Sequence, residues 1–272
     1  MIPPQFDYIR AASAQEAIAA LTEHGDEAKL LAGGHSLIPL LKLRLASPSV
    51  LIDVGRVADL SYIRDDGDEV AIGALTRHRD VEHSEVLAAG VPILAAAAHH
   101  VGDPQVRNRG TIGGSLAHGD GASDLPAVVL ALGGTLVAQG PGGRREIAAQ
   151  DFFRGFLETA LAPDELLVEV RVPKTSGGWS FQKFNRRAQD WAIVGCAVAE
   201  VSGAVGVGLV NMASVPVRAT AVEEALASGA TADDAAALAA EGPEPPADIH
   251  GSSEYRAHLA RVLVGRALAE RG

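Results

Sequence analysis

Short apolar runs and helix-spaced apolar residues follow one another along the chain, a pattern that predicts a mixed α+β fold. Residues 50–54 form a β-branched run typical of a buried strand, and Glu16 stands at the capping-box position of a helix that begins at Ser13. Strands are predicted at residues 6–9, 29–32, 50–54, 69–72, 135–138, 166–172, 180–184, 193–201 and 204–211. Helices are predicted at residues 13–20, 37–45, 77–87, 92–100, 124–132, 220–228, 232–240 and 253–269. The first elements indicate a β-α-β start.

Residues 174–178 lack large apolar groups and are rich in turn formers, which predicts a domain boundary. We therefore expect a first domain at residues 1–173, with two parts at about 1–56 and 57–173, and a second domain at residues 179–272. Residues 102–121 are crowded with Gly, Asp, Asn, His and Arg, which predicts a long loop. Long ordered loops in compact domains usually carry function.

Composition narrows the classes of function. The 272 residues are 47% hydrophobic and 21% charged, which is typical of a globular protein. A formal net charge of −11 argues against nucleic acid and anionic lipid as partners. Apolar runs fall short of the roughly 18 residues of a membrane-spanning helix, and the first residues do not resemble a secretion signal, so we expect a cytoplasmic protein without an integral membrane segment.

The single cysteine, Cys196, can form neither an internal disulfide nor an iron–sulfur cluster, so any cluster must belong to another chain. Histidines 78, 83, 99 and 100 lack the spacing of a metal site, and we interpret them as surface residues. His118 and Asp120 lie near Ser115 without the sequence context of a hydrolase nucleophile. No residue is assigned a catalytic or metal-binding role.

Two glycine pairs, Gly33-Gly34 and Gly113-Gly114, are each followed within two residues by a serine. Successive N–H groups in such turns can form an anion-binding concavity, and two of them could hold one pyrophosphate. The alternative is that each pair only makes a tight turn. The chain contains neither the G-x-G-x-x-G spacing of a Rossmann site nor the Gly-Lys of a P-loop, so a dinucleotide would need another geometry.

Three ordered segments carry a resemblance to a known family. These are residues 102–126, which include Thr111-Ile112-Gly113-Gly114-Ser115, then residues 32–37 with 42–44, and residues 183–192. They resemble the FAD-binding flavoprotein subunits of the molybdenum hydroxylase, or xanthine dehydrogenase, family, in particular the medium chains of aerobic carbon monoxide dehydrogenase-type enzymes. The resemblance implies a two-part FAD domain of the vanillyl-alcohol oxidase-like (PCMH-type) fold and a smaller α+β domain after it. Gly121 departs from the second motif, where a proline is common.

The resemblance also implies site residues. Those expected around the cofactor are Ala32, Gly33, Gly34, His35, Ser36, Leu37, Thr111, Gly113, Gly114, Ser115, Asp124, Leu167, Lys183 and Trp191. The glycine motifs would wrap the diphosphate.

Six residues have more than one interpretation. Asp124 would reach ribityl or ribose hydroxyls, or would cap a helix. Leu167 would touch the adenine or the flavin edge, or would be core. Lys183 would place a positive charge near the flavin, or would be a solvated strand lysine, and Trp191 would shield the ring or pack across the domain boundary. Arg107 and Arg109 would meet phosphates or a partner subunit, or would lie in a solvated loop.

The function implied by the resemblance is electron transfer. The chain would take electrons from a small [2Fe-2S] subunit, in an assembly with a large molybdenum-cofactor subunit, and pass them through FAD to a quinone, oxygen or NAD. A dimer of heterotrimers is implied, with contact to a membrane only at its periphery through the acceptor. Carbon monoxide, a purine, a heterocycle or an aldehyde remains open as the substrate. The alternatives are a non-redox scaffold with weak FAD binding and a stand-alone FAD-dependent oxidoreductase.

Overall fold

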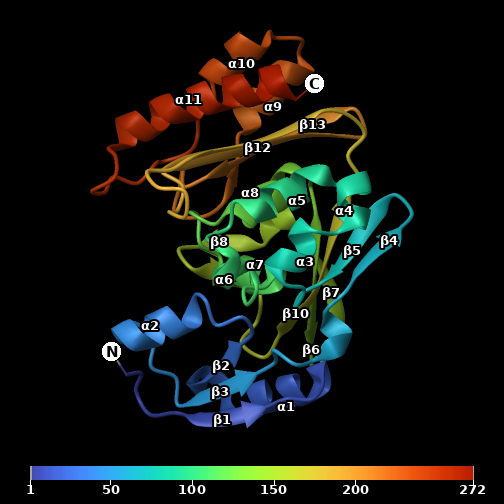
Figure 1. Cartoon of the computed structure of the whole chain (residues 1–272), viewed down its shortest axis with the longest axis vertical. Coiled ribbons are helices and arrows are strands. Elements are labelled where there is room, and N and C mark those ends of the chain that lie inside the picture. The colour runs from blue at the N-terminus through green and yellow to red at the C-terminus, as the bar shows by residue number, and fades with distance from the viewer. Residues whose placement is uncertain (1, 272) are drawn as a thin grey trace.

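The computed structural model describes residues 2–271, which form three units stacked along the long axis of the molecule (Figure 1). The amino-terminal unit has a parallel sheet of order β1-β3-β2, so the predicted β-α-β start is confirmed. Its elements are β1 (Asp7–Arg10), α1 (Ala14–His24), the 3₁₀ turn η1 (Gly25–Glu27), β2 (Ala28–Leu31), α2 (Leu37–Leu43) and β3 (Val50–Asp53).

Helix α1 begins at Ser13 with Glu16 at the predicted spacing, although Glu16 caps the N–H before the N-cap residue and not that of Ser13 itself. The Ser13 hydroxyl accepts a hydrogen bond from the Glu16 N–H at 3.1 Å, and the Glu16 carboxylate accepts from the Ala12 N–H at 2.8 Å. The helix ends at Gly25, whose φ of 53° lies in the region that favours glycine. Its apolar side, which includes Ala17 and Leu21, is buried in a cluster shared with β3, so the cap and the core both determine where this helix lies.

The middle unit is built on an antiparallel sheet of order β4-β5-β10-β6-β7. Its strands are β4 (Ile63–Asp66), β5 (Glu69–Gly73), β6 (Thr135–Gly140), β7 (Gly143–Ala148) and β10 (Leu166–Pro173), with the hairpin β8 (Phe153–Gly155) and β9 (Glu158–Thr159). Its helices are α3 (His78–Glu82), α4 (Glu85–Gly90), α5 (Pro92–His99), α6 (Pro104–Arg107), α7 (Ile112–His118) and α8 (Asp124–Ala131), with the 3₁₀ turns η2 (Ala58–Leu60) and η3 (Ala149–Asp151).

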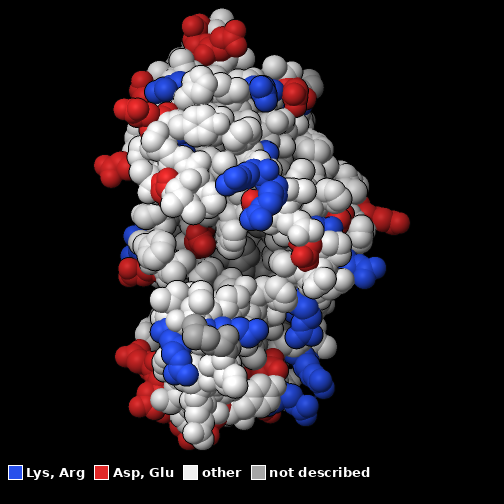
Figure 2. Space-filling view, turned by 60° about the vertical axis from the view of Figure 1, so that its left-hand side comes forward, with Lys and Arg blue, Asp and Glu red and all other residues white. Residues whose placement is uncertain are grey.

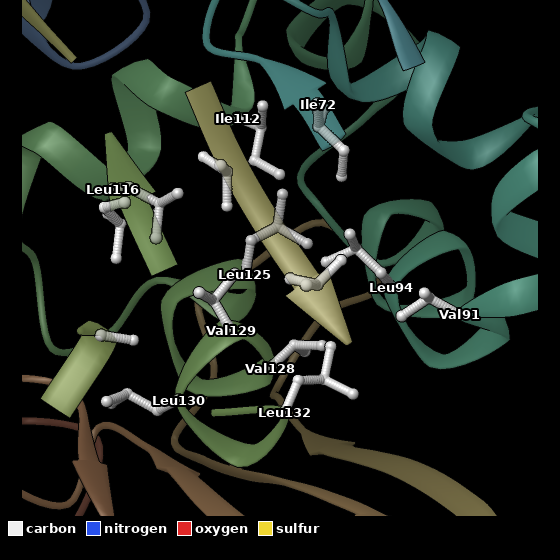
Figure 3. Packing of buried hydrophobic residues seen from close by; sticks show 14 of the residues in the cluster. Ile72, Val91, Leu94, Ile112, Leu116, Leu125, Val128, Val129, Leu130 and Leu132 are labelled. Atoms are coloured by element: carbon white, nitrogen blue, oxygen red, sulfur yellow. The ribbon is translucent and has the colours of Figure 1, made fainter. Parts of the chain in front are cut away.

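The largest hydrophobic core fills the space between this sheet and its helices. Figure 3 shows side chains of the helices and of the sheet converging there, among them Ile72 of β5, Leu94 of α5, Ile112 of α7 and Leu125 of α8. Each of these four is fully buried. Because α7 is anchored in this core by Ile112 and Leu116, the residues on its other side are held in a defined position.

Three sequence predictions are corrected here. Residues 77–87 form two helices because the Ser84 hydroxyl accepts from the Leu87 N–H at 3.2 Å and starts α4. Residues 102–121 are not one loop but hold α6 and α7, whose caps are the polar residues Asp103 and Thr111. Strand β7 was not predicted, because in this edge strand Ile147 is buried while its neighbours are exposed.

The carboxy-terminal unit has an antiparallel sheet of order β11-β12-β13-β14, with helices over one face and the middle unit against the other (Figure 1). Its elements are β11 (Trp179–Phe184), β12 (Val194–Val201), β13 (Ala204–Val210), β14 (Val217–Arg218), α9 (Thr220–Ala227), α10 (Ala232–Ala237) and α11 (Ser253–Glu270). Among residues 2–271, no helix combines the length and the apolar character needed to cross a membrane.

Two glycines of β13 allow α8 to pack directly on the sheet. A Cβ added to Gly206 would lie 1.9 Å from the Ala131 carbonyl oxygen, and one added to Gly208 would lie 1.9 Å from that of Ala127. Both clashes are with helix backbone, which cannot rotate away. The middle and carboxy-terminal units are therefore joined by a backbone contact that needs glycine on the strand.

We predict that Gly208→Ala destabilises the chain by about 1–3 kcal/mol, because it overpacks this contact. The measurement is urea denaturation followed by circular dichroism. Gly142→Ala is the matched control, since open space surrounds that glycine. Equal free energies of unfolding for the two variants would show that α8 does not rest on β13 as described.

Candidate functional site

A cavity of about 740 Å³ lies where the three units meet. Its wall combines the turn after β2, the start of α7, the first residues of α8, the segment after the β8–β9 tip and the end of β11 with the loop that follows. Figure 2 shows this face of the molecule hollowed above the amino-terminal unit, with basic side chains gathered over the hollow. The volume lies within the range of about 300–1,000 Å³ common for small-molecule and cofactor sites.

Most residues singled out from the sequence meet in this wall. Those lining it are Ala32, Gly33, Gly34, His35, Ser36, Leu37, Thr111, Gly114, Ser115, Asp124, Lys183 and Trp191. Gly113 and Leu167 do not line it. Gly113 is buried where a Cβ would lie 2.5 Å from the Ala74 Cβ, and Leu167 is 4% exposed within the main core. Leu167 therefore lies in the core that its alternative interpretation described.

The first glycine turn supplies free N–H groups. Within residues 2–271, no hydrogen-bond acceptor is found for the N–H of Gly33, Gly34, His35 or Ser36. Gly34 has a φ of 77°, a conformation that side chains rarely adopt. Successive unpaired N–H groups beside a cavity are suited to bind an anion such as a diphosphate.

The second glycine motif differs from its prediction, because its N–H groups already have partners. The N–H groups of Ile112 and Gly113 donate to the carbonyls of Thr76 and Ala74, and the Gly114 N–H donates to the Thr111 hydroxyl at 3.1 Å. The expectation of two equivalent N–H concavities is wrong in this respect. This motif instead contributes shape, through the missing side chain of Gly114, and the hydroxyl group of Ser115.

The two motifs nevertheless touch, although they are far apart along the chain. A Cβ on Gly33 would lie 2.4 Å from the Arg109 carbonyl oxygen and 2.7 Å from the Gly110 Cα, just before Thr111. A Cβ on Gly114 would lie 3.9 Å from the Ala32 Cβ. The turn after β2 and the start of α7 therefore form one continuous part of the cavity wall.

A buried ion pair forms another part of the wall. The Lys183 ammonium donates to Asp124 Oδ2 at 2.7 Å and to the His100 carbonyl at 2.8 Å, and the two side chains are 3% and 7% exposed. Lys183 is therefore not a solvated strand lysine. Asp124 does not cap α8, because the helix N-cap is Ser123 and no side-chain cap bond forms.

One oxygen of this pair has no partner. Asp124 Oδ1 is buried and makes no hydrogen bond within residues 2–271. Burial raises the pKa of Asp124 to about 6, and the neighbouring Lys183 ammonium opposes that rise. A buried acceptor without a donor is costly in a folded protein. A hydroxyl group of a ligand in the cavity would satisfy Asp124 Oδ1.

His78 is a site residue that the sequence did not reveal. It was expected at the surface, but it is 4% exposed, it lines the cavity, and its Nδ1 has no partner within the described chain. Burial lowers the pKa of His78 to about 4, so the ring is neutral at physiological pH. Its ring packs under Gly110, where an added Cβ would lie 2.6 Å from the His78 Cδ2. Nothing in the spacing of the histidines distinguishes it from an exposed one.

Two further predictions concern residues around the opening. Trp191 lines the cavity, and 59% of the residue's surface is exposed, so its indole is available at the surface. Arg107 faces neither the cavity nor open solvent, because its side chain is 12% exposed and donates to Glu82 at 2.7 Å. The solvated-loop interpretation of Arg107 is therefore wrong and its side chain is outside the cavity wall, because its charge pairs with Glu82 inside the middle unit. Contact with a partner subunit stays a prediction.

These features fit a flavin dinucleotide. The free N–H groups after β2 suit a diphosphate, the Ser115 hydroxyl and Asp124 Oδ1 suit polar groups of a sugar or ribityl chain, and Lys183 suits an electron-rich ring. The residues present are thus chemically matched to the group that the sequence motifs imply.

Comparisons of the sequence with known proteins agree with a flavin dinucleotide as the cofactor. Residues 4–175 match the family described as FAD binding domain in molybdopterin dehydrogenase, and residues 179–271 match the CO dehydrogenase flavoprotein C-terminal domain. The chain is 42% identical to the carbon monoxide dehydrogenase medium chain of Hydrogenophaga pseudoflava, over 98% of this chain and 97% of that one. It is 38% identical to the nicotine 6-hydroxylase medium subunit of Paenarthrobacter nicotinovorans, over 99% and 98% of the two chains.

Solved structures give the same answer. The fold is similar to a chain of carbon monoxide dehydrogenase from Hydrogenophaga pseudoflava, with a TM-score of 0.96 and 44% identity over 100% of this chain and 98% of that one. It is also similar to quinoline 2-oxidoreductase from Pseudomonas putida 86, with a TM-score of 0.92 and 36% identity over 100% and 98%. The predicted α+β fold and FAD as cofactor are confirmed, and the chain belongs to the FAD-binding flavoprotein subunits of the molybdopterin-dependent dehydrogenases, the family of the carbon monoxide dehydrogenase medium chains.

Proposed function

We propose that this chain accepts electrons from an iron–sulfur partner and passes them through FAD to an external acceptor such as a quinone, oxygen or NAD. The observation that carries the proposal is the buried Asp124–Lys183 pair in the cavity wall, in which Asp124 Oδ1 has no hydrogen-bond donor in the described part of the chain. A structural ion pair would have both oxygens satisfied in a packed interior. Here one oxygen is left for a ligand.

The chain's own residues bind and orient the cofactor, whose contribution when bound is the exchange of one or two electrons. The N–H groups of Gly33 to Ser36 would hold the diphosphate, and Thr111 holds the start of α7 beside them. Asp124 Oδ1 would accept a hydrogen bond from a cofactor hydroxyl. Lys183 keeps a positive charge at the wall, where it would favour added electron density on the ring, and Trp191 would limit access from solvent.

The proposed electron donor is a partner, because this chain cannot build its own cluster. Its cysteine, Cys196, is fully buried, and burial raises the pKa of the thiol to about 12, so it is a poor ligand as well as a single one. A cluster that feeds electrons to this chain would therefore belong to another chain. We propose a small [2Fe-2S] subunit and a large molybdenum-cofactor subunit, in a dimer of heterotrimers. That several relatives are called medium chains or medium subunits supports this assembly.

The substrate is proposed to be selected elsewhere in the assembly. Relatives with 38–42% identity over nearly the whole chain carry names that refer to carbon monoxide, nicotine and glyceraldehyde. Such different reductants are compatible with one flavoprotein fold if this chain handles electrons and not the substrate.

The test is to purify the chain with its copurifying subunits and record its absorbance spectrum. We expect flavin near one per chain, bleached by the reductant that the large subunit oxidises and restored by the acceptor. A colourless complex that cannot be reconstituted with FAD would favour the scaffold alternative. A flavin-loaded chain that turns over alone would favour the stand-alone oxidoreductase.

Asp124→Asn is predicted to raise the midpoint potential of the bound flavin by roughly 30 mV or more, about 1.4 kcal/mol for a two-electron couple, because the Lys183 charge loses its counter-ion. Redox titration of the assembled enzyme at pH 8 measures this midpoint potential. Asp65→Asn is the matched control, since Asp65 forms an exposed pair with Lys174.

The difference between wild type and Asp124→Asn should also depend on pH. Below about pH 6 the wild-type carboxylate takes up a proton and loses its charge, so the two potentials should converge as the pH falls through that value. A gap that stays constant from pH 8 to pH 5 would contradict the role assigned to this carboxylate.

His78 should make the stability of the apo chain depend on pH. The pKa of His78 is about 4 in the folded state and about 6.5 unfolded, so between these values the unfolded chain binds more protons and stability is lost as the pH falls. Relative to His78→Gln, wild type should lose about 2–3 kcal/mol between pH 7.5 and pH 4.5 in urea denaturation. His258 lies on the exposed side of α11, and the free energy of unfolding of His258→Gln should change with pH in the same way as that of wild type.

A further inference from the structure

Arg77 connects three chain segments around the first glycine turn. Its guanidinium donates through Nη1 to the Arg109 carbonyl and through Nη2 to the Gly55 carbonyl at 3.3 Å. Gly55 follows β3 in the amino-terminal unit, whereas Arg109 lies between α6 and α7 in the middle unit. Arg77 itself pairs as an isolated β-bridge with Thr111, the cap of α7. One side chain therefore spans the junction of the two units.

The two carbonyls that Arg77 holds belong to the segments that meet the first glycine turn. The Arg109 carbonyl oxygen is the atom that an added Cβ on Gly33 would approach to 2.4 Å. A Cβ on Gly55 would lie 3.2 Å from the Ala32 carbonyl oxygen and 3.8 Å from Arg77 Nη2. A shift of either carbonyl would move the backbone at Ala32–Gly33, and with it the free N–H groups that follow.

The charge of Arg77 is not used in an ion pair. Within residues 2–271, no carboxylate oxygen lies within 4.0 Å of its guanidinium, in contrast to Arg107 and Arg171. Carbonyl oxygens are its hydrogen-bond acceptors, and the planar fork of guanidinium allows it to hold two of them at once. An ammonium is a single point of charge and does not match this geometry.

We propose that Arg77 is a positioning residue for the FAD site: it fixes the amino-terminal unit against the start of α7 and so sets the spacing between the first glycine turn and the second motif. The inference rests on the proposed function and deepens it. Arg77 is half-buried and does not line the cavity, so it acts through the backbone and not by touching the cofactor.

The experiment compares FAD dissociation constants for the full chain in its complex, with Arg77→Ala, Arg77→Lys and Arg79→Ala. Arg79 is the matched control, because it is exposed and donates to the Asn108 side chain. We expect Arg77→Ala to weaken FAD binding roughly ten- to hundredfold and Arg79→Ala to change it less than twofold. Millimolar guanidinium ion should restore binding to Arg77→Ala, whereas methylammonium should not.

The outcomes separate this inference from the function on which it rests. A wild-type complex that binds no FAD contradicts the proposed function and this inference together. A wild type that binds FAD while Arg77→Ala binds it within twofold overturns the role of Arg77 alone. Equal rescue by guanidinium and methylammonium, or no rescue by either, also overturns it. Should Arg77→Ala not fold, Arg77→Lys carries the test: at least fivefold weaker binding supports the role, and unchanged binding overturns it.

Discussion

The site depends on the close approach of two backbones, Gly33 of the amino-terminal unit and Arg109–Gly110 of the middle unit. The Cβ of any residue other than glycine at position 33 would lie 2.4 Å from a carbonyl oxygen, which is closer than atoms tolerate. Because this contact closes the wall between the turn after β2 and the start of α7, the cavity exists only while the two units stay together. The close contact of α8 with Gly206 and Gly208 plays the same part between the middle and carboxy-terminal units.

The charges of the site are arranged differently from those of the rest of the molecule. Most ion pairs of this acidic chain are at least partly exposed, such as Lys174 with Asp65, and contribute little to stability. Asp124 and Lys183 are instead almost fully buried, where desolvation opposes both charges. Such a pair needs further hydrogen bonds, and Lys183 has one to the His100 carbonyl, while Asp124 Oδ1 has none among the residues that the structure describes. Because one carboxylate oxygen of the pair is left without a hydrogen-bond donor, we interpret the pair as part of a binding site and not as a purely structural ion pair.

Particular residues show which features of the fold and the site could be predicted from the sequence. Helix α1 was predictable because Ser13 and Glu16 act locally, through neighbours three and four positions away. The motif around Gly113 was recognised, but its environment was not, because hydrogen bonds to Thr76 and Ala74 come from a distant segment. Three other features likewise depend on contacts between distant segments and could not be predicted locally. They are the burial of His78, the ion pair of Arg107 with Glu82 and the pairing of Asp124 with Lys183. Polar residues that cap helices can be mistaken for loop, as at Asp103 and Thr111.

The same geometry is compatible with one flavoprotein fold in proteins whose names refer to different substrates. The cavity wall is built from backbone contacts at glycine, backbone N–H groups and a buried ion pair, which match the chemistry of a flavin dinucleotide. Arg77 belongs with the features that build this wall, because it holds the two carbonyl groups whose positions the glycine contacts require. Under the proposed function, such a wall would hold the cofactor in the same way whatever reaction supplies the electrons.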